Sequence, residues 1–178
     1  VVQVDLTIPE HPCRPINTLS LKNPPAVFSF LIPALRCLAA FEPGMCLGTG
    51  HIQYLEKLAQ NIVIDEGFIT TQVIIEPQDL NQGTLVFSII PGYIGKIRFN
   101  ETGKKLTALG QYFTFPAKSK DLLNLKELEK GLENLRRLPG VKATIQIEPA
   151  EKTEGAGNIF IERQQDSWAY VGIGFNNL

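Results

Sequence analysis

The same order of elements is expected twice along this chain, and this repetition limits the folds that are open to it. Each copy predicts one strand, two helices and then two strands, and the dipeptide Pro91-Gly92 lies between the copies. The sequence has 178 residues, so each copy has the size of a small domain. We therefore expect an α+β protein built from two small and similar domains.

The first copy is predicted from its apolar periodicity. Its opening stretch alternates apolar and polar residues, as a half-buried strand does, and a later stretch repeats apolar residues at helical spacing. Gly67 follows that helix and suits a C-terminal cap, since glycine adopts positive φ without steric cost. The expected elements are a strand at 16–21, helices at 33–41 and 50–65, and strands at 68–75 and 85–90.

The second copy carries the clearest helix of the chain. Asn124 can cap this helix, with Glu127 at its third position, and four leucines follow at three-four-three spacing on one face. Pro139-Gly140 ends the helix, and residues 141–147 then alternate apolar and polar side chains, which predicts a strand with one buried face. The other expected elements are a strand at 93–99, a short helix or turn at 106–115 and a strand at 158–163.

Composition argues against several classes of protein. The chain has 17 basic and 18 acidic residues, whereas a nucleic-acid-binding protein carries a strongly basic face. No apolar run reaches the roughly 18 residues that a membrane-spanning helix needs. Because the chain begins with valine, we expect a processed or excised part of a longer protein.

Residues typical of catalysis or cofactor binding are sparse. The sequence has no Gly-x-Ser-x-Gly motif and no phosphate-binding loop between a strand and a helix. Both histidines lie in predicted loops, and a zinc-like set can be drawn only as His11, Cys13, Cys46 and His51. The His-x-Cys spacing of that set lacks the usual gap of about two to four residues. We expect no enzyme, no cofactor and no metal site.

The three cysteines allow at most one internal disulfide, with three possible pairings. Cys37 lies in the middle of the predicted helix at 33–41, where we expect it to pack as a small buried apolar side chain. The alternative is three free thiols in a cytosolic protein.

Several motifs resemble the signature of polypeptide-transport-associated (POTRA) domains in two-partner secretion transporters. The run Gly67-Phe68-Ile69-Thr70-Thr71 is similar to the Gly-Tyr-Val-Thr-Thr of that family, with Phe68 in place of the usual Tyr. Gln72 stands where the family commonly has Arg. The same letters as in the family then recur at Gln78-Asp79-Leu80, Gly83-Thr84-Leu85 and Pro91-Gly92.

The second copy also resembles this family. Residues 125–132, followed by Leu138-Pro139-Gly140-Val141, are similar to the helix, turn and strand that close its second POTRA domain. The resemblance spans roughly residues 13–163 and implies β-α-α-β-β domains, each with a three-stranded mixed sheet and two helices on one face. The implied division is a linker at 1–12, POTRA domains at 13–91 and 92–164, and the start of a truncated transmembrane β-barrel at 165–178.

The end of the chain fits that last part. Along residues 168–175, alternate side chains face opposite sides of an expected strand, and Trp168 and Tyr170 lie on the same side. This pattern is typical of the start of a transmembrane barrel strand with aromatic residues at the membrane interface. A soluble edge strand is the alternative. The family resemblance also implies a Cys13–Cys46 disulfide, since these transporters carry a cysteine before the first strand and another before a Leu-Gly pair.

The implied function is protein transport. The chain is expected to face the periplasm from the bacterial outer membrane, and to recognise the N-terminal secretion domain of a large exported adhesin, haemolysin or toxin. It would pass that unfolded or partly folded partner to the barrel pore. The alternatives are a POTRA module of an outer-membrane assembly factor that binds unfolded barrel proteins, and a small periplasmic enzyme or metal-binding protein.

Sheet edges are the expected binding surfaces, because an extended chain can add to an edge through main-chain hydrogen bonds. In POTRA domains the second strand of each domain lies at a sheet edge, and here these two strands would be those at 68–75 and 141–147. The first of these strands is poor in charge and is expected to be the more adhesive, whereas Lys142 protects the second. The alternative is that the neighbouring domain covers both edges. The candidate residues are Phe68, Ile69, Thr70, Thr71, Gln72, Val73 and Ile74, and Val141, Lys142, Ala143, Thr144 and Ile145.

Overall fold

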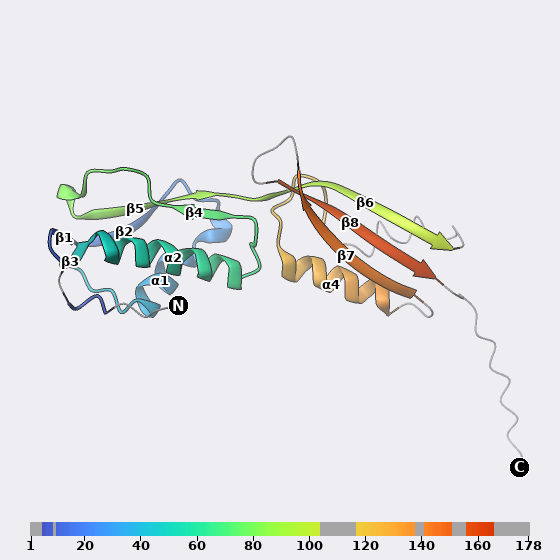
Figure 1. Cartoon of the computed structure of the whole chain (residues 1–178), viewed down its shortest axis with the longest axis horizontal. Coiled ribbons are helices and arrows are strands. Elements are labelled where there is room, and N and C mark those ends of the chain that lie inside the picture. Colours follow the sequence, from blue (N-terminus) through green and yellow to red (C-terminus); the bar gives the residue numbers. More distant parts are fainter. Residues whose placement is uncertain (1–4, 9, 104–116, 138–140, 151–155, 166–178) are drawn as a thin grey trace, which may run out of the picture. The chain divides into compact units, whose positions relative to one another are not determined.

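The computed structural model describes residues 5–8, 10–103, 117–137, 141–150 and 156–165. The chain divides into two compact units, Val1–Gly92 and Tyr93–Leu178. Each unit contains a three-stranded sheet and at least one helix packed beside it (Figure 1).

A mixed sheet organises the first unit. Its central strand is β5 (Thr84–Ile90), which pairs in parallel with β2 (Thr18–Lys22) and antiparallel with β4 (Gln72–Ile74). The strands β2 and β4 are therefore its two edges. A separate antiparallel pair, β1 (Cys13–Ile16) with β3 (Met45–Gly48), precedes the longer helix.

Two helices, α1 (Leu31–Leu38) and α2 (Thr49–Asp65), contact each other, and α2 also contacts β4. The apolar stripe predicted for the second helix is confirmed, because Leu55 and Ala59 are fully buried. Two short 3-10 helices complete the unit, η1 (Ala26–Phe28) and η2 (Leu80–Gln82). The strand pair β1–β3 was not predicted.

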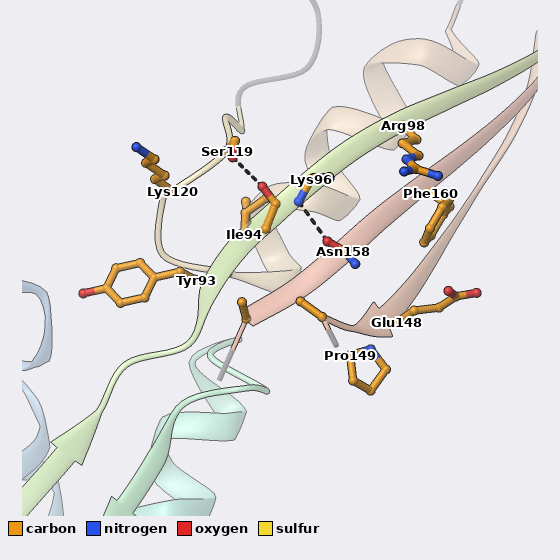
Figure 2. Close-up of a pocket in the computed structure, with 13 residues that line it drawn as sticks. Tyr93, Ile94, Lys96, Arg98, Ser119, Lys120, Glu148, Pro149, Asn158 and Phe160 are labelled. Carbon is orange, nitrogen blue, oxygen red and sulfur yellow. Dashed lines mark hydrogen bonds between the residues drawn. The ribbon is translucent and has the colours of Figure 1, made fainter. Parts of the chain in front are cut away.

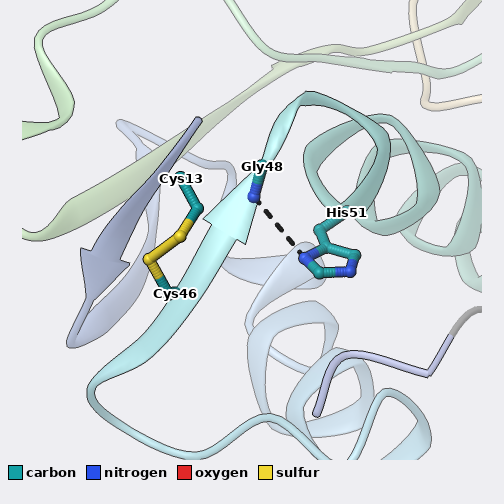
Figure 3. The surroundings of a disulfide bond; sticks show 4 residues. All are labelled: Cys13, Cys46, Gly48 and His51. Atoms are coloured by element: carbon teal, nitrogen blue, oxygen red, sulfur yellow. Dashed lines mark hydrogen bonds between the residues drawn. A yellow bond between two sulfur atoms is a disulfide. The ribbon is translucent and has the colours of Figure 1, made fainter. Parts of the chain in front are cut away.

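The first turn of α2 is capped by groups that precede it. The backbone nitrogens of Gly50 and His51 donate to Glu10 Oε2 at 2.9 and 3.3 Å, which satisfies two free N–H groups of the helix with a carboxylate. Gly48 N donates to His51 Nδ1 at 3.5 Å (Figure 3). The prediction that both histidines lie in loops is thus wrong for His51, which is buried in the first turn of α2 and falls within the helix predicted at 50–65.

The strand expected at 68–75 is wrong in its first half, because only Gln72–Ile74 belongs to β4. The ring of Phe68 packs against that of Phe28, with centroids 4.9 Å apart, and this contact holds Phe68 in the core. Thr71 N donates to Phe68 O at 3.1 Å, so residues 68–71 form a turn. Gly67 has a φ of +96°, which confirms it as the residue that ends α2.

Cys37 is exposed, which corrects the prediction that its side chain is buried. On α1, Leu31 and Leu35 are buried one turn apart. Cys37 is two residues beyond Leu35, and successive helical residues are separated by about 100°, so it points to the opposite side of the helix.

The second unit is built on another mixed sheet. Its central strand β8 (Ala156–Gln165) pairs in parallel with β6 (Tyr93–Gly103) and antiparallel with β7 (Val141–Pro149). These strands confirm the three strands predicted at 93–99, 141–147 and 158–163, and each extends beyond the predicted range. The strands β6 and β7 are the edges of this sheet (Figure 1).

The helix α4 (Leu125–Arg136) packs against the sheet, as the leucine spacing predicts. Asn124 Oδ1 accepts from Lys126 N at 3.0 Å and from Glu127 N at 3.4 Å, which confirms the predicted cap. Leu128 and Leu135 are fully buried. They belong to a core that also contains Ile94, Leu123, Ala143, Ile159 and Ile161.

Three predictions lie outside the described residues: the helix or turn at 106–115, the Pro139-Gly140 terminator and the barrel strand at 168–175. Of the predicted barrel start at 165–178, only Gln165 is described, and it belongs to β8. Within the described ranges, no helix combines the length and the apolar character required to cross a membrane.

Candidate polypeptide-binding edges

The outer edge of β4 is occupied by side chains from α2. Gln60 Oε1 accepts a hydrogen bond from Val73 N at 2.8 Å, and Gln60 Nε2 donates to Thr71 O at 2.9 Å. A carboxamide offers a donor and an acceptor, as a peptide group does, so Gln60 stands where a neighbouring strand would lie. Glu56 Oε1 accepts from Ile75 N at 2.9 Å. Three outward-facing backbone groups of this edge are therefore already paired.

The residues predicted to bind a client at this edge do not share one exposed surface. Phe68, Thr71 and Val73 are buried, whereas Ile69 and Gln72 are exposed and Thr70 and Ile74 are half-buried. A strand added beside β4 would also have to displace Gln60 and Glu56. The geometry therefore does not favour the expectation that the first edge is the more adhesive one.

The Thr-Thr and Pro-Gly motifs meet in space. Thr71 Oγ1 accepts from Gly92 N at 3.1 Å, and both groups are buried. A Cβ atom at position 92 would overlap the side chain and backbone of Thr70, so this close approach requires glycine. The two motifs thus fix the end of the first unit.

The Gln-Asp-Leu motif also has a structural role. Gln78 Oε1 accepts from Val86 N at 2.8 Å, and Gln78 Nε2 donates to Val86 O at 2.8 Å. Val86 lies on β5 beyond the end of its pairing with β4, so this side chain continues the missing strand. Asp79 accepts from Asn81 N at 3.0 Å and caps η2.

An ion pair spans the end of the first sheet. Lys22 Nζ on β2 lies 2.7 Å from Glu76 Oε2, just after β4. The hydrogen bond from Lys22, with a smaller contribution from Ser88, lowers the pKa of Glu76 below its ordinary value. Both side chains are about half exposed, so the pair adds little stability. It places the charged carboxylate of Glu76 just after β4.

The edge strand β7 of the second unit is less covered. Ala150 N donates to Ala156 O at 2.8 Å, and in the register of β7 with β8 this bond places the carbonyl of Ala143 on the outer side. Arg136 Nε, at the end of α4, donates to that carbonyl at 2.9 Å. Outward and inward backbone groups alternate along an antiparallel strand, so Ile145 and Ile147 also turn their N–H and C=O groups outward. Within the described ranges, no side chain bonds these groups. Among the residues that the structure describes, an unpaired stretch of edge therefore follows Ala143.

The side chains of β7 follow the same alternation. Ala143 is buried and Ile145 is half-buried toward the core, whereas Lys142 and Thr144 are exposed. Pro149 ends the strand and has no N–H group to offer. Lys142 lies at the edge, where the sequence predicts a protective charge, and Val141 opens the strand.

A disulfide joins Cys13 and Cys46, the pair that the family resemblance implies, and it ties β1 to β3 (Figure 3). Both cysteines are thus unavailable to a metal. Among the residues that the structure describes, no three His, Cys, Asp or Glu side chains gather into a possible metal site.

The sequence interpretation missed Gln60, Glu56 and Arg136, which decide how open each edge is. One signal was available for the first two. Glu56 and Gln60 are four residues apart and border the apolar stripe of α2, which places two long polar side chains on the same side of a helix beside a sheet.

Two family matches coincide with the two units of the chain. A POTRA domain of ShlB type matches residues 27–92, and a second POTRA domain matches residues 93–149. The "Outer membrane transporter CdiB-2" of Burkholderia pseudomallei is 31% identical over 133 residues, which is 74% of this chain and 22% of that protein. The "Hemolysin transporter protein ShlB" of Serratia marcescens is 28% identical over 145 residues, which is 81% of this chain and 24% of that protein.

The fold has the same relatives. A solved structure of CdiB from Acinetobacter baumannii superposes with a TM-score of 0.79 at 32% sequence identity, and covers 91% of this chain and 31% of that one. The N-terminal domain of Omp85 from Thermosynechococcus elongatus, at 16% identity and a TM-score of 0.63, shares the fold and covers 86% of this chain. The chain spans less than a third of the length of the CdiB and ShlB transporters that it matches.

Proposed function

Because this chain belongs to the CdiB- and ShlB-type family of two-partner secretion transporters, as its POTRA region, we propose that it recognises the exported partner in the periplasm. The family is one of outer-membrane transporters and not of enzymes. The proposed client is the N-terminal secretion domain of a large exported adhesin, haemolysin or toxin, unfolded or partly folded. The chain holds this client and delivers it to the barrel pore of the whole transporter.

The open edge of β7 is the observation that carries the proposal. An extended client can lie beside β7 and bond the outward N–H and C=O groups of Ile145 and Ile147. These bonds involve only the main chain, so the contact accepts many sequences. The footprint ends on one side at Ala143, whose carbonyl is bonded to Arg136, and on the other at Pro149.

Such a footprint is weak by itself, which suits a transporter that must release its client. A hydrogen bond formed on binding contributes a net of about 0.5–1.5 kcal/mol. Two residues, each with one donor and one acceptor, therefore supply only a few kcal/mol, and a dissociation constant near 1 mM corresponds to about 4 kcal/mol. A useful affinity requires a further contact with the same client.

The test is a titration of this chain with the secretion domain of the large exported protein encoded beside it, followed by heteronuclear NMR. We expect amide signals of β7 to shift, and those of Ile145 and Ile147 to become protected from hydrogen exchange. A client segment N-methylated at alternate residues on its pairing side should lose binding, and one methylated on the other side should retain it. No measurable binding, or shifts that avoid β7, would count against the proposal.

A further inference from the structure

The start of β6 is distorted by a β-bulge. The pairing of β6 with β8 shifts register between Ile94 and Ile97, so Gly95 and Lys96 have no direct partner strand residue. Asn158 fills this gap, since its Oδ1 accepts from Lys96 N at 3.0 Å (Figure 2). A Cβ atom at Gly95 would lie 2.6 Å from Asn158 Oδ1, so a larger residue there would displace the Asn158 carboxamide from this position.

The other side of the bulge is held by the segment that leads to α4. Lys120 N donates to Ile94 O at 2.8 Å, and Ile94 N donates to Asp121 O at 2.8 Å. Ser119 Oγ donates to Gly95 O (Figure 2). The bulge is therefore a fixed feature of this unit and not a loosely held irregularity.

A pocket of about 820 Å³ opens beside the bulge. Its lining residues on β6 and β8 alternate with Ile97, Ile159 and Ile161, which pack in the core beneath α4, so the pocket lies on the face of the sheet away from that helix. Figure 2 shows Arg98, Asn158 and Phe160 on that face. The polar, charged and aromatic side chains that line the pocket include Tyr93, Lys96, Arg98, Lys120, Asn158 and Phe160.

The pocket offers more donors than acceptors. Lys96, Arg98 and Lys120 are exposed around it, and in the described part of the chain none of them lies within ion-pair distance of a carboxylate. Among the described residues that line it, Glu148 is the single acidic one. The guanidinium of Arg98 lies 5.9 Å from the centre of the Phe160 ring, so a cation and an aromatic surface are side by side.

We propose that this pocket binds an extended polypeptide segment in which acidic residues alternate with apolar ones. Carboxylates of the segment pair with Lys96, Arg98 and Lys120, and an apolar side chain packs on Phe160. Glu148 disfavours a densely phosphorylated surface, because it would face phosphate groups, but it can accept hydrogen bonds from peptide N–H groups. Only the identification of the segment as part of the client rests on the proposed function.

The test uses a fluorescein-labelled peptide that alternates glutamate with valine and contains one phenylalanine, and a matched peptide with glutamine for glutamate. Anisotropy is measured against the whole chain, against Lys96→Gln/Arg98→Gln, and against Lys130→Gln/Arg137→Gln, which removes the same charge from α4 and the residue that follows it. We expect the first pair of substitutions to weaken binding about tenfold and the control pair less than twofold. Binding should also weaken from about 0.05 M to about 0.3 M salt.

Several outcomes would overturn the inference. If the glutamine peptide bound as tightly as the glutamate peptide, the carboxylates would have no role. If the Lys96/Arg98 variant bound the peptide as tightly as the unsubstituted chain, the binding site would lie elsewhere. Sedimentation with phosphatidylglycerol vesicles that depends on Lys96 and Arg98, without peptide binding, would identify a lipid surface instead. Client binding at β7 that persists while the acidic peptide fails to bind would reject this inference and leave the proposed function intact.

Discussion

Gln60 Oε1 lies 2.8 Å from the backbone nitrogen of Val73, so a helix side chain stands where a neighbouring strand would pair with β4. In the second unit, the corresponding bond from Arg136 reaches only Ala143 and leaves the next outward groups of β7 open. The two sheets therefore differ in how far side chains occupy the edge strand that was expected to bind a client, β4 in the first unit and β7 in the second. We infer that the first edge is closed by its own helix and that the second is the one available to a client.

Substitution of Gln60 by alanine should open the first edge. It removes one acceptor and one donor that satisfy Val73 and Thr71, and we expect the free energy of unfolding to fall by about 1–3 kcal/mol. Gln53→Ala, on the exposed side of the same helix, is the matched control and should change it by less than about 0.5 kcal/mol. Urea denaturation measures both. Equal stabilities for the two variants would show that Gln60 does not hold this edge.

The buried hydrogen bond between Thr71 and Gly92 should contribute to the stability of the first unit. Thr71→Val keeps the shape of the side chain but leaves the buried Gly92 N–H without its acceptor, at an expected cost of about 1–3 kcal/mol. Thr18→Val, at an exposed position of β2, serves as control. Thermal unfolding followed by circular dichroism compares the two, and a Thr71 variant as stable as the control would contradict this role.

The Cys13–Cys46 disulfide should stabilise the first unit. It closes a loop with a sequence separation of 33, which corresponds to about 3–4 kcal/mol in the chain-entropy description. We expect Cys13→Ser/Cys46→Ser to lower the unfolding midpoint and to abolish its dependence on reductant. Cys37→Ser, which changes an exposed free thiol, should have little effect. An unchanged midpoint in the double variant would argue against a stabilising role.

Arg136 limits the open edge of β7 from one side. Arg136→Met retains most of the side chain but frees Ala143 O, so an incoming strand gains one acceptor. We expect client affinity to rise by about threefold to tenfold, since one hydrogen bond contributes about 1 kcal/mol. Arg137→Met is the control. Weaker client binding by the Arg136 variant, at unchanged stability, would indicate that Arg136 contacts the client itself.

Periodic elements could be predicted from the sequence because their signals are local. The leucines of α4 and the cap at Asn124 lie within a few residues of one another, and both are present in the structure. Phe68–Thr71 reads as strand from its β-branched and aromatic residues. Packing of Phe68 against Phe28 overrides that propensity, and no local pattern predicts this distant contact.

The state of each edge could not be predicted for a similar reason. The partners Gln60 and Val73 are 13 residues apart, and their contact depends on how α2 lies beside β4. The charge content of a strand therefore does not predict whether its edge is free to pair, because the charge-poor strand β4 is bonded along its edge by the neutral side chain of Gln60. The bulge at Gly95 likewise depends on Asn158, 62 residues from its partner Lys96.

The most direct test of the account compares Ile147→Pro with Ile147→Ala in the client titration. Both remove the half-buried side chain, but only proline also removes the outward N–H, which is not bonded to β8, and an edge strand tolerates proline at such a position. With both variants verified as folded by circular dichroism, we predict that Ile147→Pro binds the secretion domain about tenfold more weakly than Ile147→Ala. Equal affinities would contradict strand addition at β7.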